Sequence, residues 1–171
     1  MSARLAVLVS CLSISSLAAG CGFHPLYGEI RGKPAAQAEF HSIYVDSIGS
    51  VQVGYELRNS LIGLLQAATK PDEAQYRLKV DASQGVEAIA VEPDATITRY
   101  DYQILVRYQL LDSRSGKLLT TGSESTQTAY DAVNSPYSTL VAQQDAARRS
   151  ADDMALRIQL ALAVYFHKTS K

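Results

Sequence analysis

Tryptophan is absent from this 171-residue sequence, and cysteine occurs only twice. Both cysteines, Cys11 and Cys21, lie near the N-terminus, so the rest of the chain has no thiol for a disulfide or a cysteine-bound metal. The three histidines, His24, His41 and His167, share no spacing that would place two of them on one element as metal ligands. A Gly-x-Ser-x-Gly nucleophile motif and a glycine-rich phosphate loop are also missing. We therefore expect no metal, no cofactor and no enzymatic activity.

The sequence also lacks an excess of positive charge. Lys and Arg number 16 and Asp and Glu 17, which gives a formal net charge of −1 at pH 7. A nucleic-acid-binding domain normally carries a strongly basic surface, so the composition argues against a nucleic-acid partner. The abundant aromatic residue is tyrosine, with ten copies, and it is favoured both in paired strands and at protein interfaces.

Long apolar runs are missing as well. The N-terminal run from Leu5 to Leu17 follows the basic residue Arg4 and is shorter than the ~20 residues that a membrane-spanning helix needs. A basic start, an apolar run and a small-residue exit are typical of an export signal. Cys21 directly follows Ala-Ala-Gly, which resembles a bacterial lipobox with its aliphatic Leu17 one position further upstream than usual. We expect cleavage between Gly20 and Cys21 and a diacylglyceryl group on the Cys21 thiol.

The predicted organisation has three parts: a lipoprotein signal peptide over residues 1–20, a lipidated N-terminus and tether over 21–38, and a single domain over 39–171. The tether prediction rests on Gly, Pro, Ala and charged residues between Gly28 and Ala38 that have no periodicity. An ordinary cleaved secretion signal and an uncleaved anchor are the alternatives for the N-terminus.

Period-two alternation predicts the strands of the domain. In residues 75–82, Tyr76, Leu78, Val80 and Ala82 alternate with hydrophilic side chains, which predicts a strand with one face on a core and the other in water. Residues 86–91 extend this strand, with a turn at Pro93-Asp94. Residues 96–112 alternate in the same way, and weaker signals predict strands over 40–45 and 118–130 and a hairpin connection over 112–117.

Two segments have the period of an amphipathic helix. The first covers residues 51–68, and the second covers 137–167 after the helix-start signal Ser135-Pro136. The apolar stripe expected on the second helix consists of Leu140, Ala147, Ala151, Met154, Ile158, Ala161 and Tyr165. Its outer surface is expected to carry the ion pairs Asp145–Arg149, Arg148–Asp152 and Arg149–Asp153. The order β-α-β-β-β-α predicts an α+β two-layer sandwich, with two helices packed on one face of a roughly four-stranded sheet.

Six basic side chains are predicted to lie on the polar sheet face or in the hairpin: Arg77, Lys79, Arg99, Arg107, Arg114 and Lys117. Two interpretations stay open. The face is either ordinary solvated surface, with Asp81 and Asp101 as local partners, or it binds an anionic ligand such as a phosphorylated glycolipid through charge-assisted hydrogen bonds.

Tyrosines are predicted in two environments. Tyr100, Tyr102 and Tyr108 alternate on the apolar side of residues 96–112 and are expected in the core. Tyr130 and Tyr137 flank the connection into the last helix and are expected to face a partner.

Three segments carry a resemblance to a known family. Residues 21–28 read Cys-Gly-Phe-His-Pro-Leu-Tyr-Gly, residues 100–110 form a tyrosine-rich strand before a Ser-Gly-Lys hairpin, and residues 130–137 lead into an Ala-rich helix bearing Asp and Arg. Together they are similar to alphaproteobacterial members of the lipopolysaccharide-assembly lipoprotein family (LptE).

The resemblance implies a lipid-anchored protein on the periplasmic side of the outer membrane that acts without catalysis. Members of the family have two helices on a four-stranded sheet and plug the lumen of the β-barrel lipopolysaccharide translocon (LptD). They help to assemble this barrel and to deliver lipopolysaccharide to the cell surface. The implied partners are LptD, lipopolysaccharide and the membrane, the last through acyl chains such as palmitate on Cys21. Arg114 and Lys117, with Arg77 and Lys79, are our hypothesis for the lipopolysaccharide contacts.

A different class of function stays open as the alternative. A lipid-anchored periplasmic accessory subunit of a lipid-transport ATPase system has a similar layered build. The identity of the partner discriminates between the two.

Overall fold

The computed structural model describes residues 29–30, 33–34, 37–49, 52–91, 97–132 and 135–169. The predicted signal peptide, the cleavage site at Gly20 and Cys21, and the predicted turn at Pro93 and Asp94 lie outside the described residues. Within the segment expected to be a tether, β1 (Glu29–Ile30) pairs antiparallel with β2 (Lys33–Pro34), and α2 (Gln37–Phe40) precedes the main sheet.

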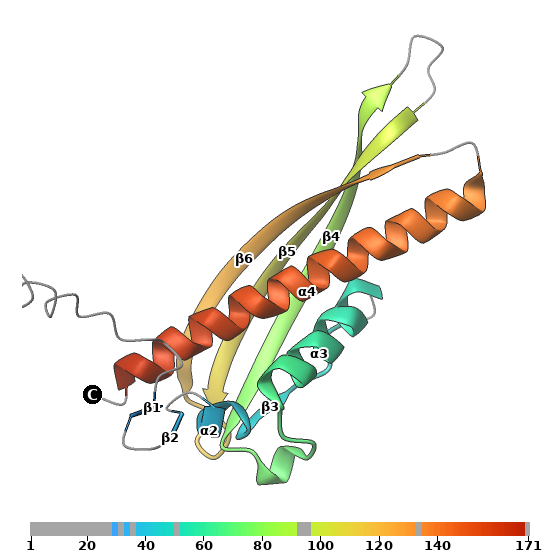
Figure 1. The fold of residues 1–171 in the computed structure, drawn as a ribbon. Helices are drawn as coiled ribbons and strands as arrows, with labels where there is room; N and C mark the ends of the chain where they lie inside the picture. The colour runs from blue at the N-terminus through green and yellow to red at the C-terminus, as the bar shows by residue number, and fades with distance from the viewer. Residues whose placement is uncertain are drawn as a thin grey trace, which may run out of the picture.

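The main body is a four-stranded sheet with two helices on one face (Figure 1). The strand order is β3-β4-β5-β6, with β3 parallel to β4 and the other two pairs antiparallel. Its elements are β3 (Ile43–Val45), α3 (Gln52–Leu65), the 3-10 helix η2 (Pro71–Glu73), β4 (Tyr76–Val91), β5 (Ile97–Asp112), β6 (Leu118–Asp131) and α4 (Pro136–Thr169). The predicted α+β fold class and element order are confirmed.

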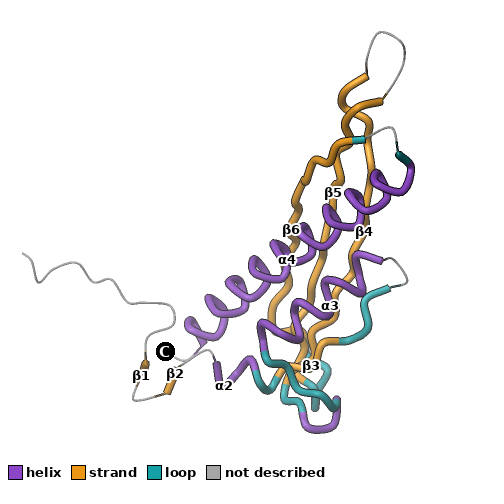
Figure 2. The backbone as a smooth tube through the Cα atoms, turned by 45° about the vertical axis from the view of Figure 1, so that its right-hand side comes forward, coloured by secondary structure: helices purple, strands orange, loops and turns teal. Residues whose placement is uncertain are grey.

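The first strand is shorter than predicted. Phe40 ends the short helix α2, a turn follows, and only Ile43–Val45 is strand. β3 therefore pairs with β4 only from Tyr76 to Leu78. By contrast, β4 and β5 each contain 16 residues, which is roughly 50 Å at about 3.3 Å per residue. Most of the sheet is therefore three strands wide (Figure 2).

Alternation along β5 separates the core from water as predicted. The side chains of Tyr102, Ile104, Val106, Tyr108 and Leu110 are buried under the helices, and those between them are exposed on the other face. Burial raises the pKa of the Tyr102 and Tyr108 hydroxyls. The predicted core positions Tyr102 and Tyr108 are confirmed, whereas Tyr100 is only partly buried against the core.

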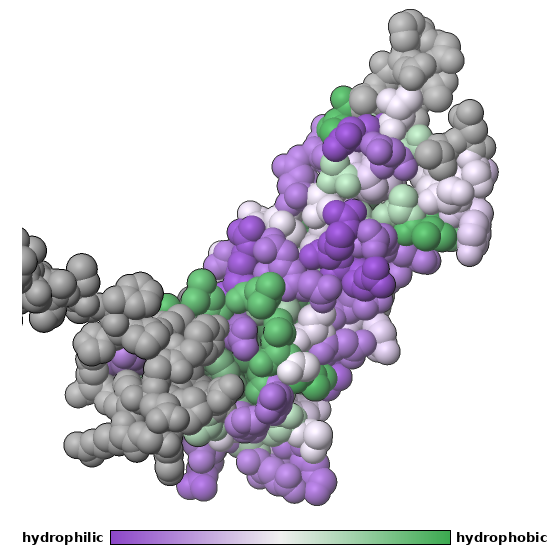
Figure 3. Space-filling view, in the orientation of Figure 1, coloured by the Kyte–Doolittle hydropathy of each residue, from purple (hydrophilic) through white to green (hydrophobic). Residues whose placement is uncertain are grey.

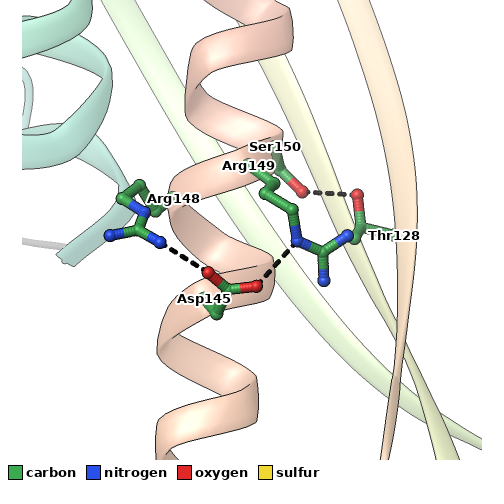
Figure 4. Close-up of polar contacts among 5 residues, drawn as sticks. All are labelled: Thr128, Asp145, Arg148, Arg149 and Ser150. Carbon is green, nitrogen blue, oxygen red and sulfur yellow. Dashed lines mark hydrogen bonds and ion pairs between the residues drawn. The ribbon is translucent and has the colours of Figure 1, made fainter.

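The helix α4 is the longest element and runs along the inner face of the sheet. Its 34 residues span roughly 51 Å at 1.5 Å per residue. The buried Ser150 Oγ donates a hydrogen bond to Thr128 Oγ1 of β6 at 2.8 Å (Figure 4). The buried side chains that face the sheet and α3 are mostly small: Ala146, Ala147, Ser150, Ala151, Met154, Ala155, Ile158, Leu162, Ala163 and Phe166.

One position of the predicted α4 stripe is wrong. Leu140 is 50% exposed, although it continues the stripe that is buried at Ala147 and Ala151. The reason is the length of α3, whose 14 residues reach only roughly 21 Å at 1.5 Å per residue. The first turns of α4 therefore extend beyond the end of the shorter helix (Figure 1).

Only one of the three predicted ion pairs on α4 is confirmed. Asp145 pairs with Arg149 at 2.8 Å, and also with Arg148 at 2.6 Å (Figure 4). These bonds, chiefly the one from Arg149, lower the pKa of Asp145.

The other two predicted pairs are wrong because tertiary partners compete for their carboxylates. Asp152 accepts a hydrogen bond from Ser60 of α3 at 2.6 Å. Asp153 accepts one from Thr126 of β6 at 3.0 Å and pairs with Arg157. The two neighbouring carboxylates thus bind α4 to the helix on one side and to the sheet on the other.

The prediction for Tyr130 is also wrong. Its side chain is only 7% exposed, and its ring stacks on that of Tyr100 with centroids 5.3 Å apart. The two residues are direct cross-strand neighbours on β5 and β6, so their rings face the same side of the sheet. Tyr137 is 75% exposed, and its role toward a partner stays a prediction.

Two glycines of α3 give a matched test of this packing. A Cβ on Gly54 would lie 2.6 Å from the Ile48 carbonyl oxygen, whereas a Cβ on Gly63 would meet nothing within 4 Å. We expect Gly54→Ala to lower the free energy of unfolding by about 1–3 kcal/mol through overpacking. Gly63→Ala should raise it by up to about 1 kcal/mol, because alanine has the higher helix propensity. Urea unfolding followed by circular dichroism measures the free energy of unfolding of both variants. Equal changes in the two variants would contradict the close approach of Gly54 to the Ile48 carbonyl oxygen.

Candidate functional site

The residues predicted to contact lipopolysaccharide fall into two groups. Arg77 and Lys79 lie near the start of β4 with exposed side chains, whereas Arg114 and Lys117 lie in the turn between β5 and β6. Asp112 holds this turn by accepting hydrogen bonds from the backbone and hydroxyl of Ser115, both at 2.7 Å. These bonds, chiefly the one from the Ser115 hydroxyl, lower the pKa of the Asp112 carboxyl.

A shallow cavity of about 570 Å³ lies on the polar face of the sheet. The strand register places Lys79 opposite Gln109 and Thr121, and Asp81 opposite Arg107 and Ser123. The side chains from β6 are short, so the longer ones from β4 and β5 stand beside an open trough. Its full lining is Lys79, Val80, Asp81, Arg107, Gln109, Thr121, Gly122 and Ser123.

A second cavity of about 480 Å³ adjoins the first, where β3 ends. The Arg77 guanidinium donates a hydrogen bond to Asp46 Oδ1 at 2.9 Å, and both side chains line this cavity. The Nε atom of Arg58, on α3, is buried without a hydrogen-bond partner among the described residues. The cavity is lined by Tyr44, Asp46, Ser47, Arg58, Pro71, Arg77, Lys79 and Val80. Lys79 lines both cavities and joins them.

We call the joined surface of Arg58, Arg77, Lys79 and Arg107 the cationic surface. Its four positive charges face only two carboxylates, Asp46 and Asp81, in the lining of the two cavities. The protein as a whole has a formal net charge of −1, so this is a local concentration of positive charge. Guanidinium and ammonium groups bind carboxylate and phosphate through short, charge-assisted hydrogen bonds, and this surface therefore has the chemistry of an anion site.

The prediction of the local partners of the basic residues was wrong. The expected carboxylates were Asp81 and Asp101, but Arg77 pairs with Asp46 and Arg99 with Asp131. Asp101 instead accepts a hydrogen bond from Gln127 of β6. No ion pair of Lys79 or Arg107 occurs within the part of the chain that the structure describes. These two cations are thus available to a ligand.

Sequence reasoning missed Arg58. It lies in a segment that was assigned only the role of an amphipathic helix, directly after the buried Leu57. A basic residue at the border of the apolar stripe of a helix was the available signal, but only the β3–β4 pairing places it beside Arg77 and Lys79.

The helix face carries a different kind of surface. Leu156, Leu160 and Val164 are 52%, 51% and 38% exposed, and their spacing of four places them on one side of α4. Gln159, in the same part of α4, donates a hydrogen bond to the Leu64 carbonyl oxygen of α3 at 3.0 Å. Apolar side chains gather over the lower half of the helices in Figure 3. Contiguous exposed apolar side chains are typical of interaction surfaces.

The described residues contain no group of three or more His, Cys, Asp or Glu residues that could hold a metal ion. None of their helices is both long and apolar enough to cross a membrane.

Comparison with known proteins gives consistent matches. The family model "LptE: Lipopolysaccharide-assembly" matches residues 40–162. An uncharacterised protein of Rickettsia prowazekii (strain Madrid E) is 30% identical over 162 residues, which cover 95% of this chain and 96% of that protein.

Solved structures share the fold. A Caulobacter crescentus lipoprotein has a TM-score of 0.64 and 28% identity, covering 78% of this chain and 96% of its own. The rare lipoprotein B of Shewanella oneidensis has a TM-score of 0.57 over 75% of this chain and 98% of its own, but only 12% identity, so it supports the fold alone. The family model and the relative at 30% identity both cover most of this sequence, and the chain therefore belongs to the LptE family of lipopolysaccharide-assembly lipoproteins, a non-enzymatic family.

Proposed function

We propose that the protein is an outer-membrane lipoprotein that plugs the β-barrel lipopolysaccharide translocon LptD and helps to assemble it, on the periplasmic side of the membrane. The observation that carries this proposal is the family match over residues 40–162, which includes every strand of the main sheet and most of α4. The role is one of binding and positioning, without catalysis.

The two-faced sheet supports the role of a plug. The lumen of a large outer-membrane barrel is polar, so a protein held inside it needs its own core and a hydrophilic exterior. β4 and β5 supply both, because one face is buried under the helices and the other presents Lys79, Asp81, Gln103, Arg107 and Gln109 to water. The domain is also elongated rather than spherical (Figure 1).

The membrane attachment is proposed through Cys21, after removal of residues 1–20. One acyl chain gives only marginal membrane binding, whereas two or more chains hold a protein firmly. Residues 21–38 would then connect the anchor to the domain of residues 39–171.

The proposed lipopolysaccharide contacts are Arg114, Lys117, Arg77 and Lys79. Lipopolysaccharide carries phosphate groups, which accept charge-assisted hydrogen bonds from such side chains. Lys79 is the best supported, since it lines both cavities and has no ion pair among the described residues.

The partner is the first property to test. A C-terminally tagged chain, purified from detergent-solubilised envelopes, is expected to recover one large β-barrel protein in near-stoichiometric amount by mass spectrometry. Recovery of an inner-membrane ATPase complex would instead identify the protein as an accessory subunit of a lipid-transport system. Recovery of no protein above background would contradict the proposed plug role.

The lipid anchor gives a second prediction. Replacing Cys21 with alanine removes the thiol, so the chain should lose incorporation of labelled palmitate and leave the outer-membrane fraction. Cys11→Ala serves as the control because that residue lies within the predicted signal peptide. Unchanged labelling and fractionation of Cys21→Ala would exclude lipidation at this position.

The basic contacts give a third prediction. A hydrogen bond to a charged group contributes about 1.5–3 kcal/mol, so charge reversal of Arg114 and Lys117 together should weaken lipopolysaccharide binding by about tenfold or more. Lys79→Glu should weaken it by a similar factor. The control is the charge reversal of Lys70 and Lys168, which are also exposed and change the net charge equally. Binding to immobilised lipopolysaccharide measures the effect, and an equal loss in the control would show that only net charge matters.

A further inference from the structure

Most of strand β4 has a free edge. β3 pairs only with Tyr76, Arg77 and Leu78. From Lys79 onward, β4 pairs with β5 on one side and with no described strand on the other. A free edge of this length presents a row of backbone N–H and C=O groups that can pair with another extended chain.

Hydrogen bonds at the β3 end show which residues face this edge. The Asp46 N–H donates to the Leu78 carbonyl oxygen at 3.0 Å, so the backbone groups of Leu78 point toward β3. Backbone direction alternates along a strand, which places those of Val80, Ala82, Gln84 and Val86 on the same side as Leu78. Their neighbours Lys79, Asp81 and Ser83 bond to β5 instead. The free edge therefore offers donors and acceptors at every second residue.

The edge is protected only at its far end. A register irregularity between Ala88 and Val91 disrupts the pairing with β5, and irregularities of this kind blunt an edge. The segment from Val80 to Val86 contains no proline and pairs regularly with β5. On the helix side of this segment Val86 is 44% exposed, and on the other side Asp81 and Ser83 are exposed. A strand that binds here would thus meet an apolar side and a polar side.

The cavity of Arg58, Arg77 and Lys79 lies where the free edge begins. Lys79 and Val80, its first residues, line that cavity. The buried Nε of Arg58 lacks a partner among the described residues, and Lys79 has no ion pair there. An incoming carboxylate would meet an exposed ammonium group in this cavity, beside a guanidinium group that forms no ion pair among the described residues. Along the other edge of the sheet, α4 packs beside β6.

We propose that an extended segment of the barrel partner adds to the β4 edge at Val80–Val86, and that an acidic side chain at its end binds in the cavity of Arg58, Arg77 and Lys79. This inference rests on the proposed function, since it names the contact through which the barrel holds the plug, and lipopolysaccharide would reach Lys79 from the polar-face cavity that this residue also lines. Recognition combines backbone hydrogen bonds along the edge with one charge-assisted contact, and apolar side chains of the segment would cover Val86.

The test uses photo-crosslinking in cells with the full chain and its native partner. A photoreactive residue replaces Ser83, beside the free edge, or Gln127, near the β6 edge. Each is combined with Ala82→Pro or with the matched Ser125→Pro. Ala82→Pro deletes an outward N–H of β4 and no bond to β5. Ser125→Pro likewise deletes an outward N–H of β6. The Ala132 N–H donates to the Thr98 carbonyl oxygen, so the even-numbered residues of β6 bond to β5 and the odd-numbered ones, Ser125 included, face outward.

We expect position 83 to crosslink to one continuous segment of the barrel protein with an Asp or Glu near one end. Ala82→Pro should lower this yield by about tenfold, through lost backbone bonds and the bulk of the proline ring, and Ser125→Pro should not. Arg58→Met should lower it by about the same factor, whereas Arg148→Met, on the outer surface of α4, should not. Thermal unfolding monitors the fold of each variant, and if Ala82→Pro fails to fold, Arg58→Met decides.

Two failures are distinguishable. In the first, the barrel co-purifies with the unmodified chain, but position 83 gives no crosslink, or its crosslinking yield is unchanged by both Ala82→Pro and Arg58→Met. Strand addition at β4 is then wrong, and the plug role stands. If the barrel does not co-purify with the unmodified chain, the proposed function and this inference both fail.

Discussion

The close packing of α4 on the inner face of the sheet is the contact on which the rest of the structure depends. Small buried residues at Ala147, Ser150 and Ala151 let the helix approach the strands, and Ser150 bonds directly to Thr128. Asp152 and Asp153 then fix the helix to α3 and to β6. Because both helices are held on one side, the opposite side of the sheet is left to water. A dry face and a wet face are thus two results of one packing arrangement.

Periodicity was sufficient to predict this arrangement because burial in a two-layer sandwich is decided residue by residue. Alternation along β5 assigned Tyr102 and Tyr108 to the core and Arg107 to the wet face, all of which the structure confirms. What alternation could not give was the pairing partner of each strand. The burial of Tyr130 follows from its position opposite Tyr100, and the partners of Asp152 and Asp153 come from other elements. Tertiary contacts of this kind leave no local pattern in the sequence.

The same distinction applies to the candidate site. Arg77 and Lys79 could be placed on the polar face because side-chain direction in a strand follows from position alone. Arg58 belongs to a helix, and its position beside them depends on how α3 lies over β3 and β4. The ion pair between Arg77 and Asp46 was equally hidden, since it joins residues separated by the whole of α3. A candidate anion site assembled from two elements therefore emerges only once their packing is known.

The shortness of β3 links the cavity to the free edge. Had β3 run the length of β4, its side chains and backbone would have covered both the edge and the space beside Arg58. Instead the chain leaves the sheet at Asp46, so that Lys79 and Val80 stand at the boundary between a paired and an unpaired stretch. Long regular edges are aggregation hazards in isolated proteins. An edge that stays regular over Val80–Val86, beside Arg58 and Lys79, which form no ion pair among the described residues, fits a surface that a specific partner covers.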